Sequence, residues 1–225
     1  MRWPRPNGSM TMIDKSFLLD KLDEMFPSAH CELNFSSPFE CLVAVSLSAQ
    51  TTDNSVNRVT PRLFSTYPTP VEMAKADIKE VEEIIHSIGL YHNKAKNIIS
   101  LSKAIVENFN GEVRLDKKTL TSLPGVGIKT ANVVLAEAAH IPSIPVDTHV
   151  SRVSIRLGLA KEGDAPEVVE KKLEKIFPKE RWIKMHHQLI FLGRRVCSAR
   201  SPQCETCPLS VQCKEGKKRL STKGK

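Results

Sequence analysis

Apolar residues recur at intervals of three and four along most of the chain, which is the spacing of one face of an α-helix. One such face follows Asp14, a residue type that favours helix N-caps. It consists of Phe17, Leu18, Leu22, Met25 and Phe26. A second face, closed by Gly89, consists of Val81, Ile84, Ile85 and Ile88. No segment shows the alternation of a half-buried strand, so the pattern predicts an all-α protein.

Polar motifs predict where several helices begin. Ser37-Pro38-Phe39-Glu40 and Thr69-Pro70-Val71-Glu72 both have the form of a capping box with proline at the first helical position. The first opens a helix from Cys41 to about Gln50, whose residues are nearly all apolar, so we expect this helix at the centre of the fold. Asp53 is expected to cap the helix that follows.

Leu90 and Tyr91 are two large apolar residues in a predicted loop between helices. From these residues alone, Leu90 is interpreted as part of the core.

The segment Leu123-Pro124-Gly125-Val126-Gly127 predicts a tight turn that leads into an apolar helix. Glycine permits a close approach to a ligand because it has no Cβ. The first N–H groups of the following helix have no partner within it, and together with the helix dipole they can bind a phosphate. The alternative is an ordinary turn between two packed helices.

Lys129 lies in the predicted first turn of that helix, where the partial positive charge of the N-terminus disfavours its protonated form. An amine in this position suits a nucleophile, and the alternative is a simple phosphate contact. Asp147 follows 18 residues later, after Pro145 and Val146. Its carboxylate can face Lys129, cap the helix that begins at Thr148, or do both.

Length and composition narrow the class of protein. The chain has 225 residues, enough for one large or two small domains, and it contains no apolar run of 18 residues. Its start, Met1-Arg2-Trp3-Pro4-Arg5-Pro6, lacks the apolar region of a secretory signal. We therefore expect a soluble, cytoplasmic protein with a disordered leader over residues 1–9.

The net charge of +8 is concentrated at the two ends of the chain. Residues 214–225 form a basic tail with six basic residues and one acidic residue, which gives +5, and Arg2 with Arg5 adds +2. Because only about +1 remains for the body of the chain, nucleic-acid binding there must depend on a local patch.

Four cysteines lie within 17 residues near the C-terminus, with the spacing C-x6-C-x2-C-x5-C. They are Cys197, Cys204, Cys207 and Cys213. Disulfides are rare inside cells, so four adjacent thiols indicate a metal centre. Zinc sites with four cysteines usually contain two C-x-x-C pairs, whereas this motif has one, and a [4Fe–4S] cluster tolerates such spacing. Spacing alone leaves both metals open.

Together, the hairpin motif, Lys129, Asp147 and the cysteine spacing resemble the endonuclease III family of DNA glycosylases. The resemblance extends from about Glu32 to Cys213 and includes Leu33-Asn34-Phe35-Ser36-Ser37-Pro38-Phe39-Glu40, Leu47-Ser48-Ala49-Gln50 and Gly89-Leu90-Tyr91. The turn matches the family's helix-hairpin-helix. One departure is Ile128, where the family often has a basic residue, and this departure puts one phosphate contact in doubt.

The resemblance implies two helical lobes. A six-helix barrel containing the helix-hairpin-helix would span about residues 33–140. A second lobe, built from residues 10–32 and 141–213, would carry a [4Fe–4S] cluster held by the four cysteines, which organises a DNA-binding loop and takes no part in the chemistry.

The resemblance also implies an activity in base excision repair. The expected protein is a monomer that binds double-stranded DNA with damaged bases or abasic sites, removes oxidised pyrimidines and cleaves the strand by β-elimination. Lys129 matches the family's nucleophile and Asp147 its carboxylate. The segment Gly125-Val126-Gly127 would bind a phosphate through its backbone. Gln50 and Leu90 match residues that fill the gap left by the extruded nucleotide, which replaces the core interpretation of Leu90.

Two alternatives remain at this point. An adenine-mismatch DNA glycosylase shares the hairpin and the cluster, but lacks a nucleophilic lysine at the position of Lys129. A non-catalytic helix-hairpin-helix DNA-binding module would need neither Lys129 nor Asp147.

Overall fold

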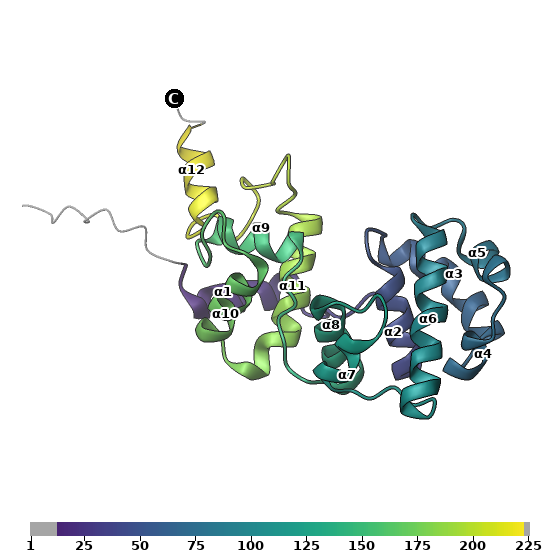
Figure 1. Ribbon diagram of the computed structural model, residues 1–225. Coiled ribbons are helices and arrows are strands. Elements are labelled where there is room, and N and C mark those ends of the chain that lie inside the picture. The colour runs from purple at the N-terminus through teal and green to yellow at the C-terminus, as the bar shows by residue number, and fades with distance from the viewer. Residues whose placement is uncertain (1–12, 223–225) are drawn as a thin grey trace, which may run out of the picture. The chain divides into compact units, whose positions relative to one another are not determined.

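The computed structural model describes residues 13–222, and every regular element within that range is a helix (Figure 1). This confirms the predicted all-α class. The described chain divides into two compact units, one formed by residues 31–143 and the other by residues 13–30 with 144–222. None of the helices in the described range is long and apolar enough to cross a membrane. The predicted leader, residues 1–9, lies outside the described residues, as do residues 223–225.

The unit of residues 31–143 is built around helix α2, which is buried along most of its length. Helix α8 packs on α2, and the long helix α6 packs on α4 and α5. The helices of this unit are α2 (Pro38–Leu47), α3 (Asp53–Thr66), α4 (Pro70–Ala74), α5 (Ile78–Ile85), α6 (Tyr91–Phe109), α7 (Lys117–Ser122) and α8 (Ile128–Ala139). The expected central position of the apolar helix after Ser37 is confirmed.

Side chains cap these helices largely as predicted. The Ser37 hydroxyl accepts a hydrogen bond from the Glu40 N–H at 3.2 Å, while the Glu40 carboxylate accepts from the Ser36 N–H at 2.6 Å. The prediction that Asp53 caps α3 is wrong. Thr52 is the N-cap, and its hydroxyl accepts a hydrogen bond from the Ser55 N–H. Asp53 is the first helical residue, where its negative charge interacts favourably with the helix dipole.

The other unit combines both ends of the described chain. Its helices are α1 (Lys15–Met25), α9 (Thr148–Leu157), α10 (Pro166–Ile176), the 3₁₀ turn η1 (Lys179–Arg181), α11 (Trp182–Arg195) and α12 (Lys214–Thr222). Helix α1 packs on α11. The Asp23 carboxylate of α1 forms ion pairs with Arg181 at 2.9 Å and with Lys184 at 2.8 Å. It also accepts a hydrogen bond from the Gln188 side-chain amide at 2.8 Å. The Arg181 hydrogen bond is the main reason that the pKa of Asp23 lies well below its usual range.

The segment expected as a basic tail begins with helix α12, which packs on α9. Gly216 is buried, and a Cβ built on it would lie 2.8 Å from the Ser210 Cα and 2.9 Å from the Ser210 carbonyl oxygen. Because real Cβ atoms do not approach a backbone this closely, the docking of α12 depends on glycine at this position. The charged residues Lys217, Lys218 and Arg219 remain exposed on the helix.

Candidate functional site

The predicted turn at residues 123–127 joins α7 to α8. Some of its residues are needed for its backbone conformation and others for its packing. Gly125 has a φ of +75°, which favours glycine, and a Cβ there would lie 3.0 Å from Cγ of Asn97. Val126 is buried, and its N–H donates to the Leu123 carbonyl at 3.1 Å. The Val126 N–H is therefore engaged within the turn. Gly127 is the N-cap of α8 and supplies no capping side chain, so the first N–H groups of this helix are suited to a phosphate.

Lys129 and Asp147 occupy the helix positions that the sequence predicts for them. Lys129 is exposed in the first turn of α8. Asp147 is the N-cap of α9, and its Oδ1 accepts from the Val150 N–H at 2.7 Å. The capping role of Asp147 is therefore confirmed, and it occupies one carboxylate oxygen. Lys129 belongs to the unit of residues 31–143, and Asp147 to the other unit.

Gln50 and Leu90 share an uncommon backbone conformation. Gln50 has a φ of 54° and Leu90 a φ of 60°, both in the left-handed region that non-glycine residues seldom adopt. Both side chains are exposed, Leu90 with 56% of its surface accessible. The core interpretation of Leu90 is therefore wrong. Its apolar character suggested burial, whereas the left-handed turn before α6 directs the side chain to the surface.

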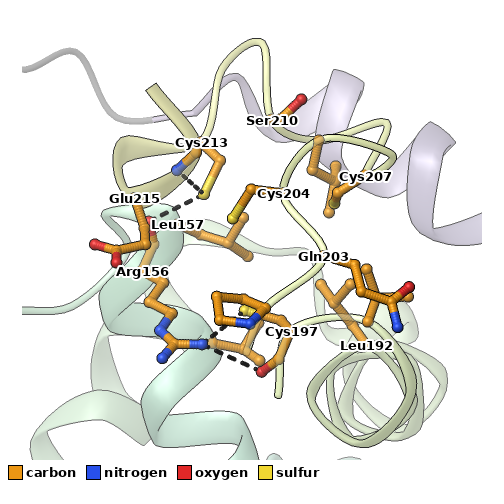
Figure 2. A pocket seen from close by; sticks show the side chains of 15 residues that line it. Arg156, Leu157, Leu192, Cys197, Gln203, Cys204, Cys207, Ser210, Cys213 and Glu215 are labelled. Carbon is orange, nitrogen blue, oxygen red and sulfur yellow. Dashed lines mark hydrogen bonds between the residues drawn. The ribbon is translucent and has the colours of Figure 1, made fainter. Parts of the chain in front are cut away.

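The four cysteines of the C-terminal motif line one pocket in the unit that contains α9, α11 and α12, as Figure 2 shows. About 380 Å³ of empty space, including open solvent, lies among its lining residues. Apolar side chains such as Val153, Leu157 and Leu192 also line it, and Glu215 and Gly216 of α12 border it. The sequence motif has thus brought all four thiols to a common cavity.

Four cysteine thiols are the ligand set of a [4Fe–4S] cluster and also of a structural zinc site. Within residues 13–222, no three groups from histidine, cysteine, aspartate or glutamate gather around one point. The chemistry of the four donors therefore fits either metal.

Burial raises the pKa of the Cys204, Cys207 and Cys213 thiols. Burial therefore favours the neutral form of these cysteines, while the positive charges of Arg219 and Arg156 act in the opposite direction at Cys204. Coordination to iron would deprotonate the thiols. Cys213 also donates through its Sγ to the Arg156 carbonyl at 3.2 Å, and its sulfur accepts from the Gly216 N–H at 3.4 Å.

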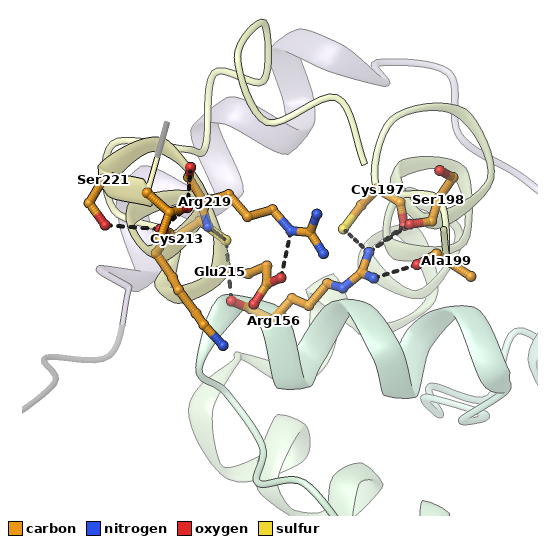
Figure 3. Close-up of polar contacts among 11 residues, drawn as sticks. Arg156, Cys197, Ser198, Ala199, Cys213, Glu215, Arg219 and Ser221 are labelled. Carbon is orange, nitrogen blue, oxygen red and sulfur yellow. Dashed lines mark hydrogen bonds and ion pairs between the residues drawn. The ribbon is translucent and has the colours of Figure 1, made fainter. Parts of the chain in front are cut away.

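Residues 197–213, which contain the four cysteines, are called the cysteine loop below. Arg156 of α9 holds the start of this loop, a role that the sequence did not predict (Figure 3). Its guanidinium donates to the Ser198 carbonyl at 2.7 Å, to the Ala199 carbonyl at 2.8 Å and to the Cys197 Sγ at 3.4 Å. A possible signal was the placement of Arg152 and Arg156 four residues apart on a helix whose other face is apolar.

Arg152 joins the helix that Asp147 caps to the same loop. It donates to the Gly193 carbonyl at 2.9 Å and to the Cys197 carbonyl at 3.3 Å. Burial lowers the pKa of His149, so its neutral ring can accept from the Arg152 guanidinium at 3.1 Å. Helix α9 and the cysteine loop are therefore one hydrogen-bonded assembly.

Comparison with known proteins agrees with this architecture. Residues 43–179 match the family model described as "HhH-GPD superfamily base excision DNA repair protein", and residues 197–213 match the "Iron-sulfur binding domain of endonuclease III". The second match begins and ends at Cys197 and Cys213. These matches define the class as a helix-hairpin-helix protein of base excision DNA repair with an iron–sulfur domain.

Individual relatives narrow the class further. The chain is 54% identical to endonuclease III of Bacillus subtilis over 90% of its own length and 93% of the relative's. It is 47% identical to endonuclease III of Escherichia coli, over 87% and 92% of the two chains. A solved structure of a trapped endonuclease III–DNA covalent intermediate matches with a TM-score of 0.87 and 53% identity, over 91% of this chain and 96% of that one. The chain belongs to the endonuclease III family.

Membership of this family identifies the cofactor as a [4Fe–4S] cluster. The four cysteines that line one pocket are the ligand set that such a cluster requires. The zinc alternative is set aside, and so are the adenine-mismatch glycosylase and the non-catalytic module.

Proposed function

We propose that this protein is a DNA glycosylase with lyase activity at abasic sites, which removes oxidised pyrimidines during base excision repair. One observation carries the assignment. Lys129, an exposed amine, lies two residues after the glycine turn, in the first turn of α8, and the chain is 53% identical to a protein trapped as a covalent intermediate with DNA. We also propose that it acts in the cytoplasm, as a monomer on damaged double-stranded DNA.

Binding begins at the hairpin. The N–H groups of Gly127 and of the first turn of α8 would hold a phosphate of the damaged strand, and Gly125 permits the turn that presents them. Extrusion of the target nucleotide then exposes its C1′. The exposed side chains of Gln50 and Leu90 would occupy the gap that the nucleotide leaves in the duplex.

The chemistry is assigned to Lys129 and Asp147. The neutral amine of Lys129 donates its electron pair to C1′, the bond from C1′ to the base breaks, and its electrons leave with the base. The Asp147 carboxylate favours the cationic sugar and accepts a proton from the attacking amine. The sugar ring opens to an imine. Loss of a C2′ proton then breaks the C3′–O bond and releases the 3′ phosphate, which cuts the strand.

Cys197, Cys204, Cys207 and Cys213 would hold the [4Fe–4S] cluster. When bound, the cluster would cross-link residues 197–213 through its iron–thiolate bonds. Arg156 and Arg152 position the same loop from α9.

Reductive trapping tests the assignment of the nucleophile. Borohydride reduces an imine to a stable protein–DNA adduct, so the wild type should form that adduct on a lesion-bearing duplex. Lys129→Gln should still bind the duplex, because the hairpin N–H groups remain. It should neither form the adduct nor cut the strand, because the amine is gone. Lys75→Gln, which changes an exposed lysine in another part of the same unit, is the matched control and should behave as the wild type. Trapping of Lys129→Gln at the wild-type rate would contradict the assignment.

A further inference from the structure

Lys94 is a buried lysine in the first turn of α6, with only 6% of its surface accessible. Its amine donates a hydrogen bond to the hydroxyl of Thr51, a residue 43 positions earlier in the chain. Burial lowers the pKa of Lys94, since the charged form loses solvent. A buried amine is costly to retain, and a purely packing role could be filled by an apolar side chain.

This hydrogen bond joins the loop that contains Gln50 to the loop that contains Leu90. Thr51 directly follows Gln50. On the other side, the Lys94 N–H donates to the Leu90 carbonyl at 3.0 Å, which closes the first turn of α6. A continuous path therefore runs from Leu90 through the backbone and side chain of Lys94 to Thr51 and Gln50. All of these residues belong to the same compact unit.

The left-handed conformation of Leu90 is not held by a capping hydrogen bond of its own side chain. Leu90 is the N-cap of α6, yet its apolar side chain makes no capping hydrogen bond. Leu90 and Gln50 both hold a backbone conformation that non-glycine residues seldom adopt, so surrounding structure must maintain it. The path through Lys94 is a contact of that kind, and it reaches both residues.

The same face of α6 also contacts the hairpin. Asn97 lies three residues after Lys94, which places the two side chains on one side of the helix. The Asn97 side chain lies against Gly125, close enough that a Cβ there would be 3.0 Å from its Cγ. The first two turns of α6 therefore contact the turn of the hairpin as well as the loop after α2.

We propose that Lys94 is a positioning residue for damaged-nucleotide extrusion, which holds Gln50 and Leu90 in register so that both enter the gap in the duplex together. The proposal rests on the gap-filling roles given to those residues above. Lys94 acts through them and need not touch the DNA itself.

Two substitutions remove the link from its opposite ends. Lys94→Met keeps an unbranched side chain without the amine, and Thr51→Val keeps the shape of threonine without the hydroxyl. Thr51→Ser retains the hydroxyl and should retain the function. Lys103→Met changes an exposed lysine further along α6 and serves as the matched control.

The measurement is the single-turnover rate of base removal from a duplex and from a single strand carrying the same lesion, using the holoenzyme with its cluster intact. Lys94→Met and Thr51→Val should each slow the duplex reaction roughly tenfold, as expected for loss of one hydrogen bond to a charged group, with little change on the single strand. The double variant should be no slower than either single variant, because both remove the same link.

A merely structural role for Lys94 predicts a different pattern. Both substrates would then lose rate equally, in proportion to a lowered melting temperature, and that result would overturn the proposal. Leu90→Ala separates this failure from a failure of the gap-filling roles. If Leu90→Ala slows the duplex reaction selectively and Lys94→Met does not, only the role of Lys94 is wrong. If Leu90→Ala affects both substrates equally, the gap-filling role itself is wrong.

Discussion

Three substitutions at Asp147 can separate its observed capping role from its proposed chemistry. The Asp147 Oδ1 accepts from the Val150 N–H at 2.7 Å, and removal of a helix N-cap typically costs about 1 kcal/mol. For a chain of this size, a change of 1 kcal/mol shifts the melting temperature by about 2–4 °C. Asp147→Ala should therefore melt about 2–4 °C below the wild type. Asp147→Asn and Asp147→Ser keep an oxygen that can accept the same bond, and should recover most of that loss.

Activity should follow a different order from stability. All three variants lack a carboxylate, so each should trap and cut an oxidised-pyrimidine duplex roughly 100-fold or more below the wild-type rate. Thermal melting followed by circular dichroism gives the capping effect, and borohydride trapping in a single turnover gives the chemical effect. Binding to the duplex, measured by fluorescence anisotropy, should change little.

Two results would contradict these roles of Asp147. If Asp147→Ser reacts at the wild-type rate, a capping oxygen is sufficient and the carboxylate has no chemical role. If the three variants melt at the same temperature, the 2.7 Å hydrogen bond contributes nothing measurable to stability.

Three further predictions concern α12 and the hairpin. Gly216→Ala should speed the loss of visible absorbance when the holoenzyme meets a chelator, because the new Cβ would lie 2.8 Å from the Ser210 Cα; unchanged bleaching would show that α12 does not protect the cluster. The double variant Lys217→Gln, Lys218→Gln should reduce the magnitude of the slope of log K against log salt for non-specific DNA binding by about two. The cluster of this variant should bleach no faster than that of the wild type. An identical slope would mean that these lysines are only solvated. Ile128→Arg should increase the magnitude of the same slope by about one in the same titration. A magnitude that does not increase would place residue 128 away from the phosphates.

Local signals predicted much of the proposed site. Gly125 and Gly127 imply a turn before a helix, and a carboxylate just before Thr148 implies an N-cap, because both effects operate within a few residues. The structure has both features. Thr52 and Asp53 show the limit of this reasoning. Both residue types can cap a helix, and sequence alone does not determine which one keeps an extended backbone.

Features that depend on distant parts of the chain were not predictable in this way. Leu90 has the composition of a core residue, but the left-handed turn before α6 exposes it. Lys94 has the composition of a surface residue, but its side chain is buried and bonded to a loop 43 residues away. Similarly, the charges of residues 214–225 predicted a basic tail, but their pattern does not show that Gly216 allows close contact with Ser210.

The unit that carries the cysteines is discontinuous in sequence, and this has a consequence for biogenesis. Helix α1 leaves the ribosome first, but its partners Arg181, Lys184 and Gln188 follow only after the whole of residues 31–143 has been made. The Asp14 N–H donates to the Gln212 side chain at 3.0 Å, which is synthesised later still. Because domains generally fold as units during synthesis, residues 31–143 can fold first. Cluster insertion then becomes a late step of maturation, because Cys213 is the last of the four cysteines to be made. A nascent chain that stalls before residue 181 would expose α1 without its partners.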